Sequence, residues 1–296
     1  MGKIVGFCNQ KGGTGKTTSL VNIGSYFALA KKKTLVVDMD PQANATSGVG
    51  LDPNDVSLGS YDVLVGDVIP QKAIVSTSLR YLYVLPATAA LAGAEIELIS
   101  KEKREYQLRE ILQGIKENFD YILIDSPPSL GLLTLNVLTA SDSILIPIQC
   151  EYYALEGLSR LLETIGLIKE RLNPALDIEG IILTMADFRT RLTLQVIDEV
   201  KRHFPEKTFK TIIPRNIKLS ESPSFGKPIY LYDKHCLGAK AYYNLTKEIL
   251  KEEIKGVYDG EESIGQGIGC VDSQETASGV LESERSLGDT QRINLY

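Results

Sequence analysis

Asn9-Gln10-Lys11-Gly12-Gly13-Thr14-Gly15-Lys16-Thr17-Thr18 is the stretch that decides the fold of this chain of 296 residues. Three glycines in four positions free the backbone to curl with its N–H groups pointing inward, and a ring of such donors cradles phosphates. Lys16 adds an ammonium for phosphate oxygens, and Thr17 adds a hydroxyl for Mg²⁺. The stretch therefore predicts a nucleotide-binding loop, whose expected contacts are Lys11, Gly12, Gly13, Thr14, Gly15, Lys16, Thr17 and Thr18. The alternative is an ordinary glycine-rich turn.

Apolar runs of strand type alternate along the chain with helical patterns. The predicted strands are residues 3–8, 33–38, 81–85, 120–125, 143–149 and 178–185. The predicted helices are residues 17–31, 61–64, 87–100, 104–118, 153–172 and 238–254. Because the strands are apolar on both faces, this alternation predicts an α/β fold with a doubly wound, mostly parallel sheet and helices on both faces, as in P-loop NTPases.

Three aspartates lie at the carboxyl ends of predicted strands, where α/β sheets place their chemistry. Asp38 and Asp40 follow one strand, and Asp40 is a candidate for positioning the water that attacks a γ-phosphate. Asp125 ends another strand as a Walker B aspartate does, so we expect it to hold Mg²⁺ through water. Each aspartate has a purely structural alternative as a helix cap or turn residue.

Composition divides the chain into two parts. Residues 256–296 carry eight acidic residues against two arginines, so this segment alone accounts for the net charge of −6. Its few large apolar side chains cannot offset the entropy of ordering, and we interpret it as an acidic, disordered Gly/Ser-rich tail after an ATPase domain at residues 1–255. No signal peptide or membrane span is visible, and four scattered cysteines favour the cytoplasm.

The segment 187–227 is locally basic, with nine Lys or Arg residues against five acidic ones. A neutral body with one basic sector suggests a polyanion surface, because binding through phosphates needs only a few cationic side chains. An ordinary solvated face is the equally weighted alternative.

The phosphate loop departs from the usual P-loop pattern at one position, where Gln10 replaces a glycine and an extra lysine, Lys11, follows. In this it resembles the deviant Walker A motif of ParA/MinD-class ATPases. Four further segments, at residues 37–48, 124–131, 149–157 and 213–216, are similar to the small chromosomal ParA (Soj-type) partition ATPases. The resemblance extends over nearly all of residues 1–254.

This resemblance implies an ATP- and Mg²⁺-dependent enzyme that forms a homodimer with ATP, binds double-stranded DNA without sequence preference, and hydrolyses slowly until a ParB-type partner stimulates it. It implies a cytoplasmic, nucleoid-associated protein without a membrane partner. The implied catalytic residues are Lys11, Lys16 and Asp40; the metal residues are Thr17, Asp125 and, as a candidate for the outer shell, Asp38; the adenine contacts are Met185, Pro214, Arg215 and Asn216; and the DNA contacts are Arg189 and Lys218.

Two other functions stay open on the sequence. A MinD-like division-site ATPase would need a basic amphipathic helix at the C-terminus, whereas residues 256–296 are acidic. A metabolic P-loop kinase or ligase would need an acceptor pocket, and its activity would not respond to DNA.

Overall fold

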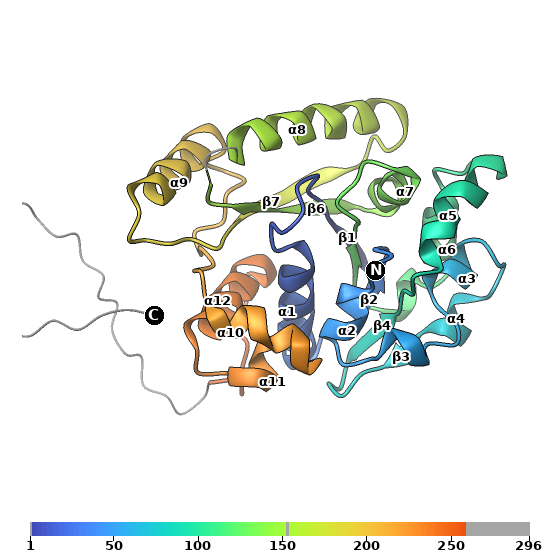
Figure 1. The fold of residues 1–296 in the computed structure, drawn as a ribbon, viewed down its shortest axis with the longest axis horizontal. Coiled ribbons are helices and arrows are strands. Elements are labelled where there is room, and N and C mark those ends of the chain that lie inside the picture. The colour runs from blue at the N-terminus through green and yellow to red at the C-terminus, as the bar shows by residue number, and fades with distance from the viewer. Residues whose placement is uncertain (1, 152–153, 259–296) are drawn as a thin grey trace, which may run out of the picture. The chain divides into compact units, whose positions relative to one another are not determined.

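The centre of the fold is a seven-stranded sheet with the strand order β3-β4-β2-β5-β1-β6-β7 (Figure 1). Every neighbouring pair is parallel except β3 and β4, which are antiparallel. The strands are β1 Lys3–Phe7, β2 Thr34–Asp38, β3 Val75–Ser76, β4 Leu82–Leu85, β5 Tyr121–Asp125, β6 Ser143–Gln149 and β7 Asp177–Thr184. The predicted doubly wound, mostly parallel sheet is therefore confirmed.

Helices cover both faces of the sheet, with α1 and α12 on one face and α7 and α8 on the other (Figure 1). The α-helices are α1 Lys16–Leu29, α2 Asn44–Gly48, α3 Ser60–Leu64, α4 Pro70–Ala73, α5 Leu91–Glu97, α6 Gln107–Gln113, α7 Leu132–Ala140, α8 Ala154–Arg171, α9 Arg191–His203, α10 Ile217–Glu221, α11 Ile229–Asp233 and α12 Leu237–Leu250. Short 3-10 helices are η1 Pro53–Asp55, η2 Leu98–Ser100, η3 Lys116–Asn118 and η4 Ser222–Phe225.

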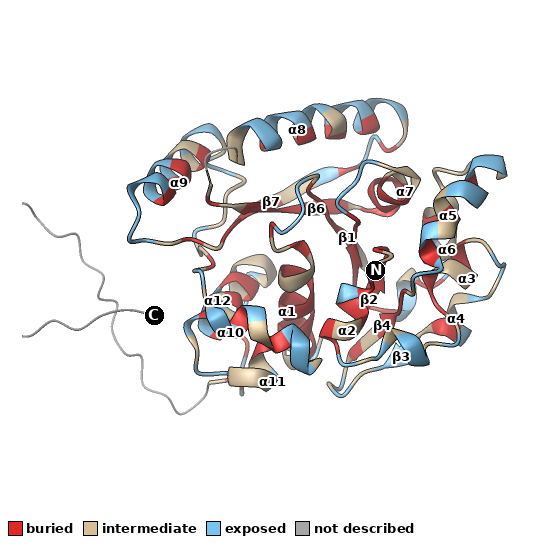
Figure 2. Ribbon diagram, in the orientation of Figure 1, coloured by how far each residue is buried: buried red, intermediate tan, exposed pale blue. Residues whose placement is uncertain are grey.

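The inner strands of the sheet are buried on both faces, which explains their apolar character. All five residues of β2 are buried, and Figure 2 shows the inner strands and much of α1 in red. In contrast, α8 buries only Leu158, Leu161, Ile165 and Ile168, at helical spacing along one side. A rigid sheet of this kind presents the carboxyl ends of its strands along one edge, where the phosphate loop lies.

Three predicted helices differ from the structure by more than two residues at one end or both. The single helix expected at residues 87–100 is α5 followed by η2, and the one expected at 104–118 is α6 followed by η3. The side chain of Asn136 accepts from the Leu108 N–H at 3.0 Å and donates to the Arg104 carbonyl at 2.8 Å, so tertiary contacts fix the start of α6. The last helix ends at Leu250 because Lys251 is left-handed, with φ of 56°.

The structure, a computed structural model, describes residues 2–151 and 154–258, and the described residues up to Val257 form one compact unit. The predicted tail lies outside the described residues from position 259 onward, so its disorder and the boundary at residue 255 stay predictions. Among the described helices, none combines the length and the apolar character needed to cross a membrane.

Candidate active site

The phosphate loop connects β1 to α1 through two residues with left-handed backbone. Gly13 has φ of 72° and Gly15 has φ of 85°, backbone conformations that residues with a Cβ atom adopt rarely. Gly15 is also the N-cap of α1, which starts at Lys16. The free N–H groups and the positive end of α1 therefore face the loop, which is the usual arrangement for binding phosphate.

Hydrogen bonds to the neighbouring strands β6 and β7 hold this loop in place. The Asn9 amide donates to the Pro147 carbonyl at 2.7 Å, and its oxygen accepts from the Lys11 N–H at 3.0 Å. The Thr184 hydroxyl, at the end of β7, lies 2.8 Å from the Thr14 carbonyl oxygen. The sequence patterns predict no role for Asn9 or Thr184, although a polar residue near the end of a buried strand is a usable signal for Thr184.

The two lysines of the loop point to different surroundings. Lys16 is buried, at 6% exposure, as expected of a lysine that faces into a phosphate cradle. The side chain of Lys11 is 48% exposed, and its ammonium lies 2.9 Å from a carboxylate oxygen of Glu151. Lys11 is therefore outside the cradle of its own chain.

Asp38 and Asp125 end adjacent strands and are paired in register. One oxygen of the Asp125 carboxylate accepts a hydrogen bond from the Thr17 hydroxyl at 2.6 Å. The other oxygen, Oδ1, is buried and has no hydrogen-bond partner in the described residues. A hydroxyl beside a carboxylate with an unsatisfied buried oxygen fits the oxygen ligands that Mg²⁺ prefers, taken directly or through water.

The charges of these carboxylates are poorly compensated by the protein. Burial raises the pKa of Asp125 well above its usual range, and the negative charge of Asp38 adds to this, while Thr17 and Lys16 oppose it. Burial likewise raises the pKa of Asp38 to about 6, against hydrogen bonds from Thr46. A cation placed beside Asp125 would favour the charged forms and reverse these shifts.

Asp38 organises the loop that carries Asp40. The Asp38 carboxylate accepts from the Thr46 N–H at 2.8 Å, from the Thr46 hydroxyl at 2.7 Å and from the Asp40 N–H at 3.1 Å. The Thr46 hydroxyl in turn accepts from the Ala87 N–H at 2.9 Å. Thr46 thus connects two strand ends, a contact that sequence spacing does not reveal. A place for Asp38 near the metal stays a prediction.

Asp40 lies at the start of the turn that leads into α2. It is 7% exposed, and its carboxylate accepts from the Gln42 N–H at 3.0 Å. Ala43 then adopts φ of 53°, a left-handed conformation that is uncommon outside glycine. Strain of this kind persists only where the surroundings impose it, and it is found often at functional sites. The water-positioning role of Asp40 stays a prediction.

All four predicted adenine contacts line one cavity of about 260 Å³ beside the phosphate loop. Met185 follows β7 with φ of 53°, and Pro214, Arg215 and Asn216 precede α10. The side-chain oxygen of Asn216 is buried and lacks a hydrogen-bond partner throughout the part of the chain that the structure describes. An acceptor of this kind suits an amino group on a ligand.

The two predicted DNA contacts lie on different elements, and each has an acidic partner. Arg189 precedes α9, is 87% exposed, and binds both oxygens of Asp187 at 2.7 and 2.8 Å. This guanidinium lowers the pKa of Asp187 to about 2. Lys218 on α10 lies 3.2 Å from Glu221 and stands over the Tyr232 ring. The basic sector is therefore exposed but locally neutralised at these two positions.

Comparison with known proteins places this site in a family. A family model described as an AAA domain matches residues 2–178. Sporulation initiation inhibitor protein Soj of Bacillus subtilis is 56% identical over 249 residues, which are 84% of this chain and 98% of that protein. Chromosome-partitioning ATPase Soj of Treponema pallidum is 50% identical over 253 residues, which are 86% of this chain and 99% of that protein.

A solved structure with a different printed activity shares the fold. Cobyrinic acid a,c-diamide synthase from Mycobacterium smegmatis, crystallised with an ATP analogue and magnesium, matches with a TM-score of 0.74 and 34% identity, over 85% of this chain and 95% of that chain. The identity to the Soj proteins is higher and extends over nearly their whole length. The chain therefore belongs to the ParA/Soj family of chromosome-partitioning ATPases.

Proposed function

We propose that this chain moves DNA cargo by switching between two states. With ATP it forms a homodimer that binds double-stranded DNA without sequence preference, on the nucleoid in the cytoplasm. A ParB-type partner then stimulates hydrolysis, and the dimer and its DNA contacts are lost. In this scheme the rate of ATP hydrolysis determines how long the dimer stays bound to DNA.

The different surroundings of Lys11 and Lys16 carry this proposal. Lys16 is buried in the loop, whereas Lys11, five residues earlier, is about half exposed and bonded away from it. A lysine that serves only its own nucleotide would be expected inside the cradle. An exposed lysine beside the phosphate loop is instead available to a nucleotide bound by a second copy of the chain.

Within one chain, each nucleotide-binding residue has a defined task. The loop N–H groups and Lys16 bind the phosphates, and Asn216 accepts from the base. Thr17 and Asp125 would hold Mg²⁺, which when bound with ATP neutralises charge on the phosphate oxygens. Asp40 would orient the attacking water. In phosphoryl transfer such positioning accounts for most of the catalysis, which fits a site with few reactive groups.

Dimerisation explains how two weakly basic positions become a DNA-binding surface. In each subunit Arg189 and Lys218 offer only two cations, both beside carboxylates. Linking two such surfaces makes the second contact intramolecular, so the affinity of the dimer rises far above that of the monomer. DNA binding should then depend on ATP and weaken steeply with salt.

The test is DNA binding measured by mobility shift with ATP, with ADP and without nucleotide, over a series of salt concentrations. We expect a shift with ATP that disappears with ADP and at high salt. Equal binding in all three conditions would refute a nucleotide-controlled switch.

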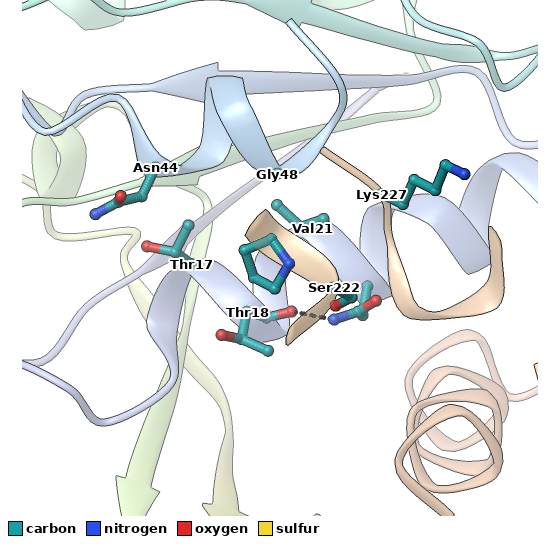
Figure 3. A pocket seen from close by; sticks show the side chains of 9 residues that line it. Thr17, Thr18, Val21, Asn44, Gly48, Ser222 and Lys227 are labelled. Atoms are coloured by element: carbon teal, nitrogen blue, oxygen red, sulfur yellow. Dashed lines mark hydrogen bonds between the residues drawn. The ribbon is translucent and has the colours of Figure 1, made fainter. Parts of the chain in front are cut away.

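A metabolic ligase is the second candidate, because one of the similar solved structures is named as a diamide synthase. Such an enzyme needs an acceptor pocket near the phosphates, and a cavity of about 230 Å³ lies beside Thr17 and Asn44, between α1, α2 and η4 (Figure 3). There the Asn22 side chain is bonded to the Thr18 carbonyl, shown as the dashed line. Activity that is unaffected by DNA and requires a small acceptor would favour this candidate.

A further inference from the structure

Lys11 is paired with a carboxylate from a segment that is distant in the sequence. Its ammonium lies 2.9 Å from Oε2 of Glu151, in the turn between β6 and α8. We propose that Glu151 is a positioning residue that holds Lys11 against its own subunit, so that the dimer forms only when nucleotide phosphates of a second copy replace this carboxylate. The inference rests on the proposed ATP-dependent dimer and adds the contact that opposes its formation.

Both partners are anchored, so the contact is built into the fold. The Gln149 amide donates to the other carboxylate oxygen of Glu151 at 2.5 Å, and the Glu151 N–H donates to the Gln149 carbonyl at 2.8 Å. The backbone of Lys11 is fixed by Asn9 at 3.0 Å. Glu151 therefore presents one oxygen toward Lys11, at the end of the strand that also carries the Pro147 carbonyl to which Asn9 is bonded.

The strength of this pair suits a contact that must be released. The side chains of Lys11 and Glu151 are 48% and 45% exposed. Exposed pairs of this type change an equilibrium by up to about five-fold. A triphosphate presents several negative oxygens where Glu151 presents one, so it can replace the carboxylate. ADP lacks the γ-phosphate and should compete less well, which makes the exchange sensitive to the nucleotide.

Removing the charge of Glu151 should therefore promote dimerisation. Glu151→Gln keeps the size of the side chain but removes the carboxylate that holds Lys11. Two such pairs break in each dimer, so the dimerisation constant should rise by up to about 25-fold. The matched control is Glu156→Gln on α8, because Glu156 is in an exposed pair with Arg160, at 2.6 Å, and not with Lys11.

Two measurements test the inference. The first is sedimentation equilibrium of wild type, Glu151→Gln and Glu156→Gln with a non-hydrolysable ATP analogue and Mg²⁺. The second is the rate at which an amine-reactive reagent labels Lys11 without nucleotide, read by peptide mass spectrometry. An amine must leave its carboxylate before it reacts, so Glu151→Gln should label Lys11 up to about five-fold faster. Lys32, which is paired with Glu252, is the internal reference.

The outcomes separate this inference from the proposed function. Stronger dimerisation and faster Lys11 labelling in Glu151→Gln alone support the inference. Equal or weaker dimerisation in a variant that melts like wild type overturns it, as does unchanged labelling. If wild type itself stays monomeric with the analogue, the proposed function fails, while the labelling ratio still decides whether Glu151 holds Lys11.

Discussion

The nucleotide site and the two basic positions, Arg189 and Lys218, differ in whether their polar side-chain atoms have partners. At the nucleotide site, oxygens of Asp125 and Asn216 are buried without hydrogen-bond partners in the described residues. At the basic positions, Arg189 and Lys218 are exposed and already paired with carboxylates. At the nucleotide site, a ligand can supply partners for the unpaired buried oxygens and so offset the free-energy cost of their burial. At the basic positions, Arg189 and Lys218 must break their existing ion pairs before they bind a ligand. Each prediction below tests one side of this contrast.

The largest effect is expected from Asp40→Ala. If the nucleotide region is preorganised, loss of the water-positioning carboxylate should lower the rate of ATP hydrolysis by at least about 100-fold. ATP-dependent DNA binding should persist, because hydrolysis is what ends it. Phosphate release and DNA co-sedimentation measure the two effects, with the exposed Asp55→Ala as control. Loss of ATP-dependent dimerisation in Asp40→Ala would count against a purely catalytic role.

A pH titration tests the buried carboxylates of the same region. Burial raises the pKa of Asp38 from 3.8 to about 6, so between these values the folded chain holds a proton that the unfolded chain has lost. Stability should therefore fall as the pH rises through this window. Without nucleotide and Mg²⁺, Asp38→Asn removes the contribution of Asp38 to this dependence. The free energy of unfolding of the variant, relative to that of wild type, should therefore rise by about 2 kcal/mol between pH 4 and pH 7.

Denaturant unfolding at each pH measures this difference. Asp67→Asn is the control, because the Asp67 side chain is 95% exposed. A difference between Asp38→Asn and wild type that does not change with pH would mean that Asp38 is charged in the folded chain throughout the range.

The nucleotide site also shows which features of the structure can be predicted from the sequence and which cannot. Strand ends such as Asp38 and Asp125, and the loop before Lys16, are encoded in local patterns of apolar residues, glycines and one lysine, so their arrangement could be predicted. Contacts made by Thr46 and Glu151 join segments distant in the chain, and no local spacing reveals them. Helix ends were wrong where a tertiary contact or a left-handed residue such as Lys251 decided them.

A smaller effect is expected at the base cavity. The buried oxygen of Asn216 can accept a hydrogen bond from the amino group of adenine, whereas guanine presents an oxygen at that position. Asn216→Ala should therefore weaken ATP binding by about ten-fold and leave weak GTP binding nearly unchanged, reducing the preference between them. Calorimetric titration with both nucleotides measures this, with the exposed Asn118→Ala as control. An unchanged ratio of the affinities for ATP and GTP would exclude Asn216 from base recognition.

The smallest effect is expected from Arg189→Ala. When Arg189 binds a DNA phosphate, its ion pair with Asp187 breaks, so the net binding free energy of each phosphate contact is small. In a dimer the substitution removes two cations, so the slope of log affinity against log salt should become shallower by about 1.8. Affinity at moderate salt should fall by only about five-fold, with ATP-dependent dimerisation unchanged.

The paired acid supplies the matched test of this last prediction. Asp187→Asn frees the Arg189 guanidinium, which now binds both Asp187 oxygens, and removes a negative charge beside it. If Arg189 contacts DNA, Asp187→Asn should strengthen binding several-fold while Arg189→Ala weakens it, and the double variant should resemble Arg189→Ala. If Arg189 lies outside the contact, both single variants should leave the salt slope unchanged. Fluorescence anisotropy over a salt series with ATP distinguishes these results, because only a direct phosphate contact changes the slope as well as the affinity.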